Sequence, residues 1–116
     1  MISTLALDTR TVNPLNAREH WARRASRTKH ERMELAFYWH VAFGGAKFQA
    51  PILVTMTRIG PRRMDDDGVV ASLKAIRDQI AEEVGIDDGD PRIAFVCRQE
   101  RGPYGVRISV ESGDCS

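Results

Sequence analysis

The feature that most constrains the fold is a helical apolar stripe that lies between segments with strand character. Beyond residue 67 the apolar residues recur at helical spacing, at Val69, Leu73, Ile76, Ile80 and Val84. Such spacing places them on one face of an amphipathic helix. Gly85 is expected to end this helix, because glycine tolerates the left-handed conformation of a C-cap. The stripe therefore predicts a helix packed against a hydrophobic core.

Strand-like segments lie on both sides of this helix, and a long helix precedes it. Short β-rich runs bounded by glycine and proline are typical of strands. The elements expected in chain order are a strand over 2–8, a helix over 17–43, a strand over 52–59, a helix from 67 or 68 to 84, and strands over 93–98 and 105–110. This order, β-α-β-α-β-β, predicts a small α/β (α+β) fold with a mixed sheet and two main helices.

The predicted strands differ in their expected surroundings. The run 52–59 is expected to be central in the sheet. In the run 105–110 apolar and polar residues alternate, so one face is expected to meet water. Gly102-Pro103 predicts a hairpin loop over 99–104, which would join the last two strands as neighbours.

The first predicted helix has two unlike halves. Asn16 and Glu19 have the spacing of a capping box at its start, and Gly44-Gly45 is expected to end it. Its first half is rich in arginine and lysine. Its second half is amphipathic, and one side of it is expected to face the core, with His40 at the edge. This predicted core-facing side consists of Met33, Ala36, Phe37, His40 and Val41.

Length and composition predict one globular domain. The chain has 116 residues, which suits a single domain over 1–116, and residues 112–116 are expected to form a frayed tail. No stretch approaches the roughly 18 apolar residues of a membrane span. The start lacks the features of a secretory signal, and Cys97 and Cys115 cannot build a disulfide framework or a zinc cluster. We therefore expect a cytoplasmic protein.

The charges are segregated along the chain although they nearly cancel overall. Residues 1–63 carry 11 basic and 4 acidic side chains, whereas residues 64–116 carry 6 basic and 12 acidic side chains. Two interpretations fit this segregation equally well. One is a basic surface beside an acidic site, and the other is a pair of solvated helix faces that differ in sign.

Three consecutive aspartates, Asp65, Asp66 and Asp67, precede the second helix. In an extended segment side chains alternate, so Asp65 and Asp67 would point one way and Asp66 the other. Paired carboxylates can hold Mg²⁺, which keeps several waters and needs few protein ligands. Aspartates also favour helix starts, where they cap free N–H groups and complement the helix dipole. From these residues alone the helix start is favoured, because capping is common and metal sites are rare.

A second acidic pair, Asp87-Asp88, lies just beyond the other end of the same helix. On a straight helix of about 18 residues the two acidic clusters would be about 27 Å apart, so they could share a metal only if the chain turned back after Gly85 or the helix started late and stopped early. Lys74 and Asp78 lie between them at i, i+4 spacing. Spacing alone favours an exposed ion pair between these two residues over a catalytic lysine.

The string Arg63-Met-Asp-Asp-Asp-Gly-Val-Val-Ala-Ser-Leu-Lys-Ala-Ile-Arg-Asp78, followed by Gly85-Ile-Asp-Asp-Gly-Asp90, resembles the RusA-like endodeoxyribonucleases, a family of Holliday-junction resolvases often found in phages and prophages. The likeness covers roughly residues 12–112 and is specific over 62–92. It implies a RusA-like fold, a homodimer, and cleavage of branched DNA, such as a four-way junction, that depends on Mg²⁺ or Mn²⁺.

The resemblance also implies roles for individual residues. By position, Asp65, Asp67 and Asp88 match metal-binding acidic positions, and Lys74 matches a catalytic lysine on the helix. Asp78 matches a further acidic helix position. Basic side chains supply affinity for phosphates without reading sequence. The candidates for DNA binding are Arg23, Arg24, Arg27, Lys29, Arg32, Arg62 and Arg63.

Two departures from the family pattern favour an alternative. Gly68 stands where the family usually has asparagine, and Lys74 lies three residues further from the acidic pair than in the best-known resolvase. The alternative is a catalytically impaired protein on the same fold that binds junction DNA. A third interpretation is a small interaction module with an ordinary capped helix, which would have no salt-dependent affinity for DNA.

Overall fold

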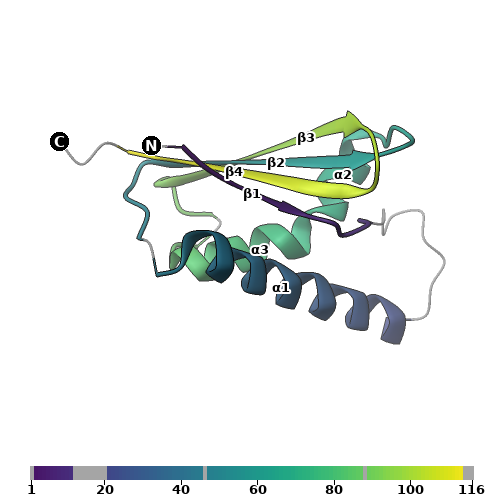
Figure 1. The fold of residues 1–116 in the computed structure, drawn as a ribbon, viewed down its shortest axis with the longest axis horizontal. Helices are drawn as coiled ribbons and strands as arrows, with labels where there is room; N and C mark the ends of the chain where they lie inside the picture. Colours follow the sequence, from purple (N-terminus) through teal and green to yellow (C-terminus); the bar gives the residue numbers. More distant parts are fainter. Residues whose placement is uncertain (1, 12–20, 46, 88, 114–116) are drawn as a thin grey trace.

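The computed structural model describes residues 2–11, 21–45, 47–87 and 89–113. Its elements, in chain order, are β1 (Ile2–Leu7), α1 (Trp21–Phe43), β2 (Ile52–Gly60), α2 (Asp66–Ser72), α3 (Lys74–Val84), β3 (Ile93–Arg101) and β4 (Gly105–Ser112). The four strands form one mixed sheet, and the helices lie together on one of its faces (Figure 1). The predicted mixed α+β fold is confirmed.

β2 lies inside the sheet, as its composition predicted. The strand order is β1-β4-β2-β3, with β2 parallel to β3 and antiparallel to β4, while β1 is antiparallel to β4. Ile52, Val54 and Met56 on β2 are almost completely buried. The alternation predicted for the last strand is also confirmed, since Val106, Ile108 and Val110 are buried and Arg107 and Glu111 are exposed.

The predicted hairpin between the last two strands is wrong. β3 and β4 do not pair with each other, because β2 lies between them. Residues 102–104 cross the end of β2, where the Gly102 N–H donates a hydrogen bond of 3.0 Å to the Gly60 carbonyl. With β3 on one side and β4 on the other, the backbone groups of the buried strand β2 are paired along both edges.

The apolar stripe of the second predicted helix packs in the core as expected. Val69, Leu73, Ile76 and Ile80 are buried, and Val84 packs against the core at its edge. The helix is divided at Leu73 (φ −98°, ψ 0°), whose N–H approaches the carbonyls of both Val69 and Val70 at 3.2 and 3.3 Å. α2 therefore turns away from α3 at the end of the sheet where β2 ends (Figure 1). Gly85 forms the predicted left-handed C-cap, with φ 81°.

The predicted buried face of the first helix is wrong. The side of α1 that meets α3 and the sheet carries Glu31, Leu35 and Trp39, all at most 5% exposed. Met33 and Phe37 are each 63% exposed, Val41 is 69% exposed, and Ala36 is half-buried. His40 is exposed rather than at the edge of the core, and its Nε2 lies 3.5 Å from Glu83. The second half of α1 has apolar residues on several sides, so periodicity alone did not identify the side that packs.

Several remaining predictions concern the ends of elements. The capping residues Asn16 and Glu19 lie outside the described residues, as do 114–116 of the predicted tail, whereas Ser112 belongs to β4.

Cys97 is half-buried against the core, and burial raises the pKa of its thiol. Cys115 lies outside the described part. No helix in that part is long and apolar enough to cross a membrane.

Candidate functional site

The three aspartates lie at the start of α2, and all three are exposed. Asp65 is the N-cap residue with extended backbone (φ −64°, ψ 153°), and Asp66 and Asp67 lie in the first turn. The helix begins at Asp66, slightly before the predicted start at 67 or 68, and the extended alternation expected for the three aspartates is wrong, because Asp66 and Asp67 are helical. The side chain of Asp65 nevertheless makes no capping hydrogen bond. Helix capping thus does not account for the Asp65 carboxylate, although the helix dipole still favours negative charge here.

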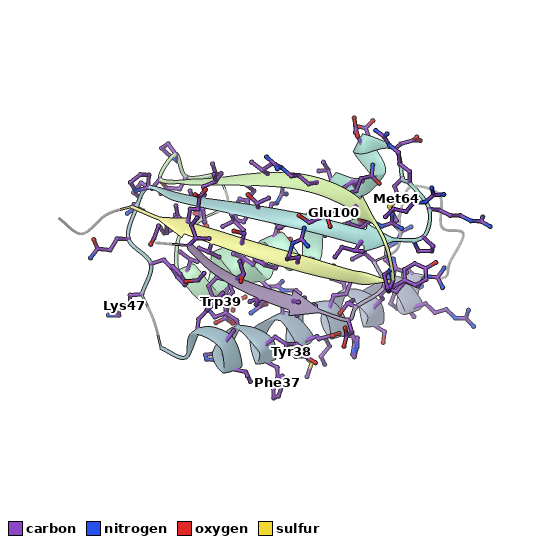
Figure 2. The ribbon with its side chains drawn as sticks, turned by 45° about the horizontal axis from the view of Figure 1, so that its top comes forward. Phe37, Tyr38, Trp39, Lys47, Met64 and Glu100 are labelled. Carbon is purple, nitrogen blue, oxygen red and sulfur yellow. The ribbon has the colours of Figure 1, made fainter. Side chains whose placement is uncertain are left out.

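Gln99 on β3 fixes the segment that leads into these aspartates. Its side-chain amide bonds both main-chain groups of Met64, accepting from the N–H at 2.9 Å and donating to the carbonyl at 2.8 Å. Met64 lies at the end of the sheet where β2 ends (Figure 2). This pair of bonds resembles one rung of a β ladder, so the chain is held in place one residue before Asp65.

Arg58 on β2 holds the turn between β2 and α2 through a hydrogen bond to its main chain. It is 4% exposed, and its Nη1 donates a hydrogen bond of 2.5 Å to the Arg62 carbonyl. A Cβ on Gly60 would lie 2.5 Å from the Arg58 Nη2, so glycine allows the guanidinium to pass beneath the turn. Together Arg58 and Gln99 hold the turn between β2 and α2 at two points.

Three arginines line a hollow next to this turn. The hollow has a volume of about 470 Å³ and is lined by Gly60, Arg62, Arg63, Gln99, Glu100 and Arg101. Arg101 comes from the end of β3, and its Nε donates to the Pro61 carbonyl at 3.3 Å. The structure thus brings Arg62 and Arg63 together with an arginine that the sequence analysis did not identify. Guanidinium groups on one wall suit phosphate, because each presents a planar fork of donors.

Lys74 and Asp78 line a second groove, between α1 and the junction of α2 with α3. They form the predicted exposed ion pair, with the Lys74 Nζ 2.9 Å from the Asp78 carboxylate. The groove, about 290 Å³, also contains Arg24, Arg27 and the buried Glu31. Glu31 lies 4.0 Å from Arg27, so part of the positive charge here is balanced within the protein.

The basic side chains of α1 have different surroundings. Arg32 is held against α3, where it donates to Gln79 at 2.9 Å and to Glu82 at 2.6 Å. Its first role is therefore to join two helices. Arg23, Arg24 and Lys29 are exposed along the first half of α1. They do not line the hollow that contains Arg62, Arg63 and Arg101.

The acidic residues beyond α3 form a separate group. Asp87 and Asp90 line a groove with Asp78, Glu82 and Arg92, and Asp88 lies outside the described residues. The Asp90 carboxylate accepts hydrogen bonds from the Arg92 guanidinium and main-chain N–H, and these bonds lower its pKa from 3.8 to about 2. α3, about 16 Å long, separates Asp87 from the start of α2, and the C-terminal end of α3 and the start of α2 lie at opposite ends of the molecule (Figure 1).

The donor set at the start of α2 suits a hard divalent cation. Asp65 and Asp67 provide exposed carboxylate oxygens, and Mg²⁺ typically binds one or two carboxylates and keeps several waters. Within the described residues, no three histidine, cysteine, aspartate or glutamate side chains are grouped closely enough to hold a metal. A third carboxylate ligand for the ion would therefore have to come from a residue outside the described part of this chain or from another subunit.

Comparisons with known proteins do not assign a family or a function to this chain. The chain matches none of the models of known protein families. No curated protein matches its sequence.

Sequence reasoning missed Gln99, Arg58, Arg101 and Glu31. None of them belongs to a motif. Gln99 and Arg101 contact residues far away in the sequence, whereas Arg58 and Glu31 each contact a residue four positions away. The only local signal was the charge of Arg58 within the strand-like run 52–59.

We expect Gln99→Leu to loosen the segment before Asp65. The substitution keeps the side-chain volume close to that of glutamine but removes both bonds to Met64. Each such bond contributes about 0.5–1.5 kcal/mol, so the Met64 amide should exchange its hydrogen at least about tenfold faster. Hydrogen exchange measured by NMR checks this. Gln79→Leu on α3 is the matched control, and equal exchange at Met64 in both variants would contradict the assigned role.

Proposed function

We propose that this chain is a Mg²⁺-dependent, structure-selective DNA endonuclease that cuts four-way junctions or related branched DNA. The observation that carries the proposal is that the exposed Asp65 and Asp67 follow directly after a turn whose Arg62 and Arg63 line a hollow with Arg101. Carboxylates that hold a metal and guanidinium groups that bind phosphate are the groups that metal-assisted hydrolysis of a phosphodiester uses. The resemblance of residues 62–92 to RusA-like resolvases supports the choice of branched DNA.

In this proposal each group has a distinct task. Asp65 and Asp67 hold the ion, which when bound activates water and neutralises charge on the leaving oxygen. Arg62, Arg63 and Arg101 bind the phosphates on either side of the bond that breaks. Gln99 and Arg58 fix the turn that carries the carboxylates, so that little ordering is needed when DNA binds.

The proposed protein acts as a homodimer. Two sites related by a two-fold axis match the near-symmetry of a four-way junction, and each subunit would cut one strand. Asp88, the third metal-binding residue implied by the resemblance, lies outside the described residues, and the described residue before it, Asp87, is separated from the first pair by α3. A carboxylate from that end can border the site if the second subunit brings it there.

A synthetic four-way junction and a linear duplex of the same sequence test the proposal. With Mg²⁺ we expect paired nicks near the branch point of the junction and little cutting of the duplex. Binding measured without Mg²⁺ should weaken by about 10²-fold or more between 50 and 200 mM salt, since several phosphates are contacted. Junction affinity that does not depend on salt would contradict the proposal and leave an interaction module.

A second candidate is a protein that binds junctions on the same fold without cutting them. The observation that favours it is the ion pair between Lys74 and Asp78, which ties the lysine to its own helix at 2.9 Å. Gly68, which replaces the family's asparagine, is buried in α2 and offers no side chain to a ligand. Salt-dependent junction binding without nicks in Mg²⁺ or Mn²⁺ would identify this candidate.

A further inference from the structure

Arg58 on β2 is a buried charge without a compensating carboxylate. It is 4% exposed, and its Nε is buried without a hydrogen-bond partner. The hydrogen bond from its Nη1 goes to a neutral acceptor, the Arg62 carbonyl. Within the described residues Arg58 forms no ion pair. Charged side chains are rarely buried unless they are paired, because removing a charge from water costs free energy. Arg58 therefore needs a negative charge that the described residues do not supply.

The guanidinium of Arg58 adjoins the arginine-lined hollow. Side chains two residues apart on a strand lie on the same face of a sheet, so Arg58 shares its face with Gly60. Gly60 pairs with Arg101 on β3, which places Arg101 on that face as well. The Arg58 Nη1 contacts the Arg62 carbonyl, and its Nη2 lies 2.5 Å from the position of a Cβ on Gly60. Since Gly60 and Arg62 both line the hollow, the buried charge lies directly behind its wall.

The hollow has more positive charge than its own carboxylate can balance. Three exposed arginines line it, namely Arg62, Arg63 and Arg101. In the part of the chain that the structure describes, its lining contains one carboxylate, Glu100, and this carboxylate is paired with Arg107 on β4, outside the lining. Guanidinium groups of like charge repel one another, and an anion between them removes this repulsion. The hollow therefore favours an anionic ligand.

The arrangement of the arginines suits a phosphate group better than a carboxylate. They come from three segments, which are the end of β2, the turn before α2 and the end of β3. A carboxylate has two oxygens in one plane, whereas a phosphate group has more acceptor oxygens, directed to several sides, and can carry more charge. The hollow, at about 470 Å³, is larger than a phosphate group, so the substituents of a phosphodiester also have room.

We propose that this hollow is a phosphate-binding site that needs no metal ion, in which the bound group supplies the charge that Arg58 lacks. The phosphate oxygens accept hydrogen bonds from Arg62, Arg63 and Arg101, and the negative charge compensates the buried guanidinium behind them. Because Arg58 also holds the turn between β2 and α2, binding of phosphate stabilises the segment that leads to Asp65.

The inference goes beyond the proposed nuclease, because the site requires neither branched DNA nor the aspartates. It gives the buried Arg58 a role in binding a ligand as well as in holding a turn. The phosphate group can come from a phosphodiester of DNA or from free inorganic phosphate, and both would occupy the same hollow. If the proposed function holds, free phosphate therefore competes with DNA for this site.

NMR titration of the full chain, without metal and at constant ionic strength, tests the site with two probes. One probe is inorganic phosphate, and the other is a dinucleoside monophosphate, which has a single phosphodiester and no terminal phosphate. We expect at least one probe to cause saturable shifts of the amide signals of residues 60 and 62–64. The probe that binds more tightly identifies the source of the phosphate group. The absence of saturable shifts with both probes would overturn the inference.

Two variants and a matched control test the arginines. Arg101→Gln and Arg58→Met should each raise the dissociation constant of that probe at least about tenfold, since each removes a charge that faces the anion. Arg98→Gln is the matched control, because it also removes one exposed arginine from β3 but lies outside the lining, and it should change the constant by less than about twofold. Arg101→Gln alters an exposed side chain and is expected to fold even if Arg58→Met does not. Equal dissociation constants for Arg101→Gln and Arg98→Gln would contradict the assigned site.

Hydrogen exchange tests the link between the site and the turn. The probe at ten times its dissociation constant should slow exchange of the Met64 amide hydrogen up to about tenfold, as expected when local opening of the turn releases the ligand. At the same concentration exchange in Arg101→Gln should slow by no more than about twofold, because this variant binds more weakly. Unchanged exchange in the saturated wild type would refute the link. Since no measurement contains branched DNA or Mg²⁺, failure of this site and failure of the nuclease proposal are distinguishable.

Discussion

Replacing Asp67 by asparagine is expected to abolish Mg²⁺-dependent cutting of a four-way junction while junction binding persists. The substitution preserves the shape of the side chain but removes the charge that holds the ion. Loss of the ion removes several kcal/mol of stabilisation from the transition state, which corresponds to at least about a thousandfold loss of rate. Binding depends on the arginines instead and should change by less than about tenfold.

Single-turnover cleavage and junction binding in Ca²⁺ or without metal are the measurements for this prediction. Asp65→Asn should behave in the same way as Asp67→Asn. Glu111→Gln is the matched control, because it also removes one exposed carboxylate but lies at the far end of β4, opposite Leu53 rather than Gly60. If Asp67→Asn cuts junctions as fast as Glu111→Gln does, the assignment of the metal to the start of α2 is incorrect.

The second prediction with a large expected effect concerns the stability of the fold, and it compares the buried side of α1 with the exposed side. Trp39→Ala is expected to lower the free energy of unfolding by about 3–5 kcal/mol, as for other buried aromatic residues. Trp39 is 3% exposed and makes edge-to-face contacts with Phe43 and Phe48, at centroid distances of 4.7 and 5.5 Å. The loss is a large part of the stability of a typical domain.

Phe37→Ala is the matched control for Trp39, because it truncates an aromatic residue on the opposite side of the same helix. Its cost should be below about 1 kcal/mol when unfolding is measured at concentrations at which the chain is monomeric. Urea denaturation followed by circular dichroism gives both values. Trp39→Phe should show an intermediate loss if Trp39→Ala is too unstable to measure. A larger effect at Phe37 than at Trp39 would mean that the sequence-based orientation of α1 was right.

The orientation of α1 shows where pattern analysis reached its limit. The second half of this helix offers two apolar rows, one of them Met33, Phe37 and Val41, and the other Leu35 and Trp39 with Glu31. Periodicity favoured the row without a charge. The folded chain buries the row with Glu31, whose carboxylate faces a groove that also contains Arg27. The pair of Glu31 with Arg27 is local, at i, i+4, but which row packs depends on the contacts of α1 with α3 and β1, and spacing within α1 does not show these contacts.

The strand arrangement had a similar limit. A three-residue connection with Gly102-Pro103 is typical of a hairpin, yet it spans the end of β2 and leaves β3 and β4 on either side of that strand. The local sequence predicted the turn, but the partner of each strand depends on pairing across the whole sheet. The same holds for Gln99, whose contact with Met64 joins residues 35 positions apart.

The candidate site was predicted in part. The motif singled out Asp65, Asp67, Arg62 and Arg63, and the structure shows that Arg62 and Arg63 line one hollow and that the two aspartates follow them at the start of α2. The carboxylates beyond α3 were expected to join them through folding or through a second subunit. Within the described chain Asp87 remains a helix length away, so folding of one chain does not bring this residue to Asp65.

The amino-acid sequence alone determined the elements of this protein, because the spacing of apolar residues, glycines and prolines acts over a few residues and sets helix, strand and turn directly. It also placed the acidic cluster at the start of a helix. Only the tertiary structure decided which side of α1 is buried, which strands are neighbours, and which arginine joins Arg62 and Arg63 in the hollow next to the turn before α2. Those features arise from contacts between distant residues, and their energies exist only once the chain has brought the partners together.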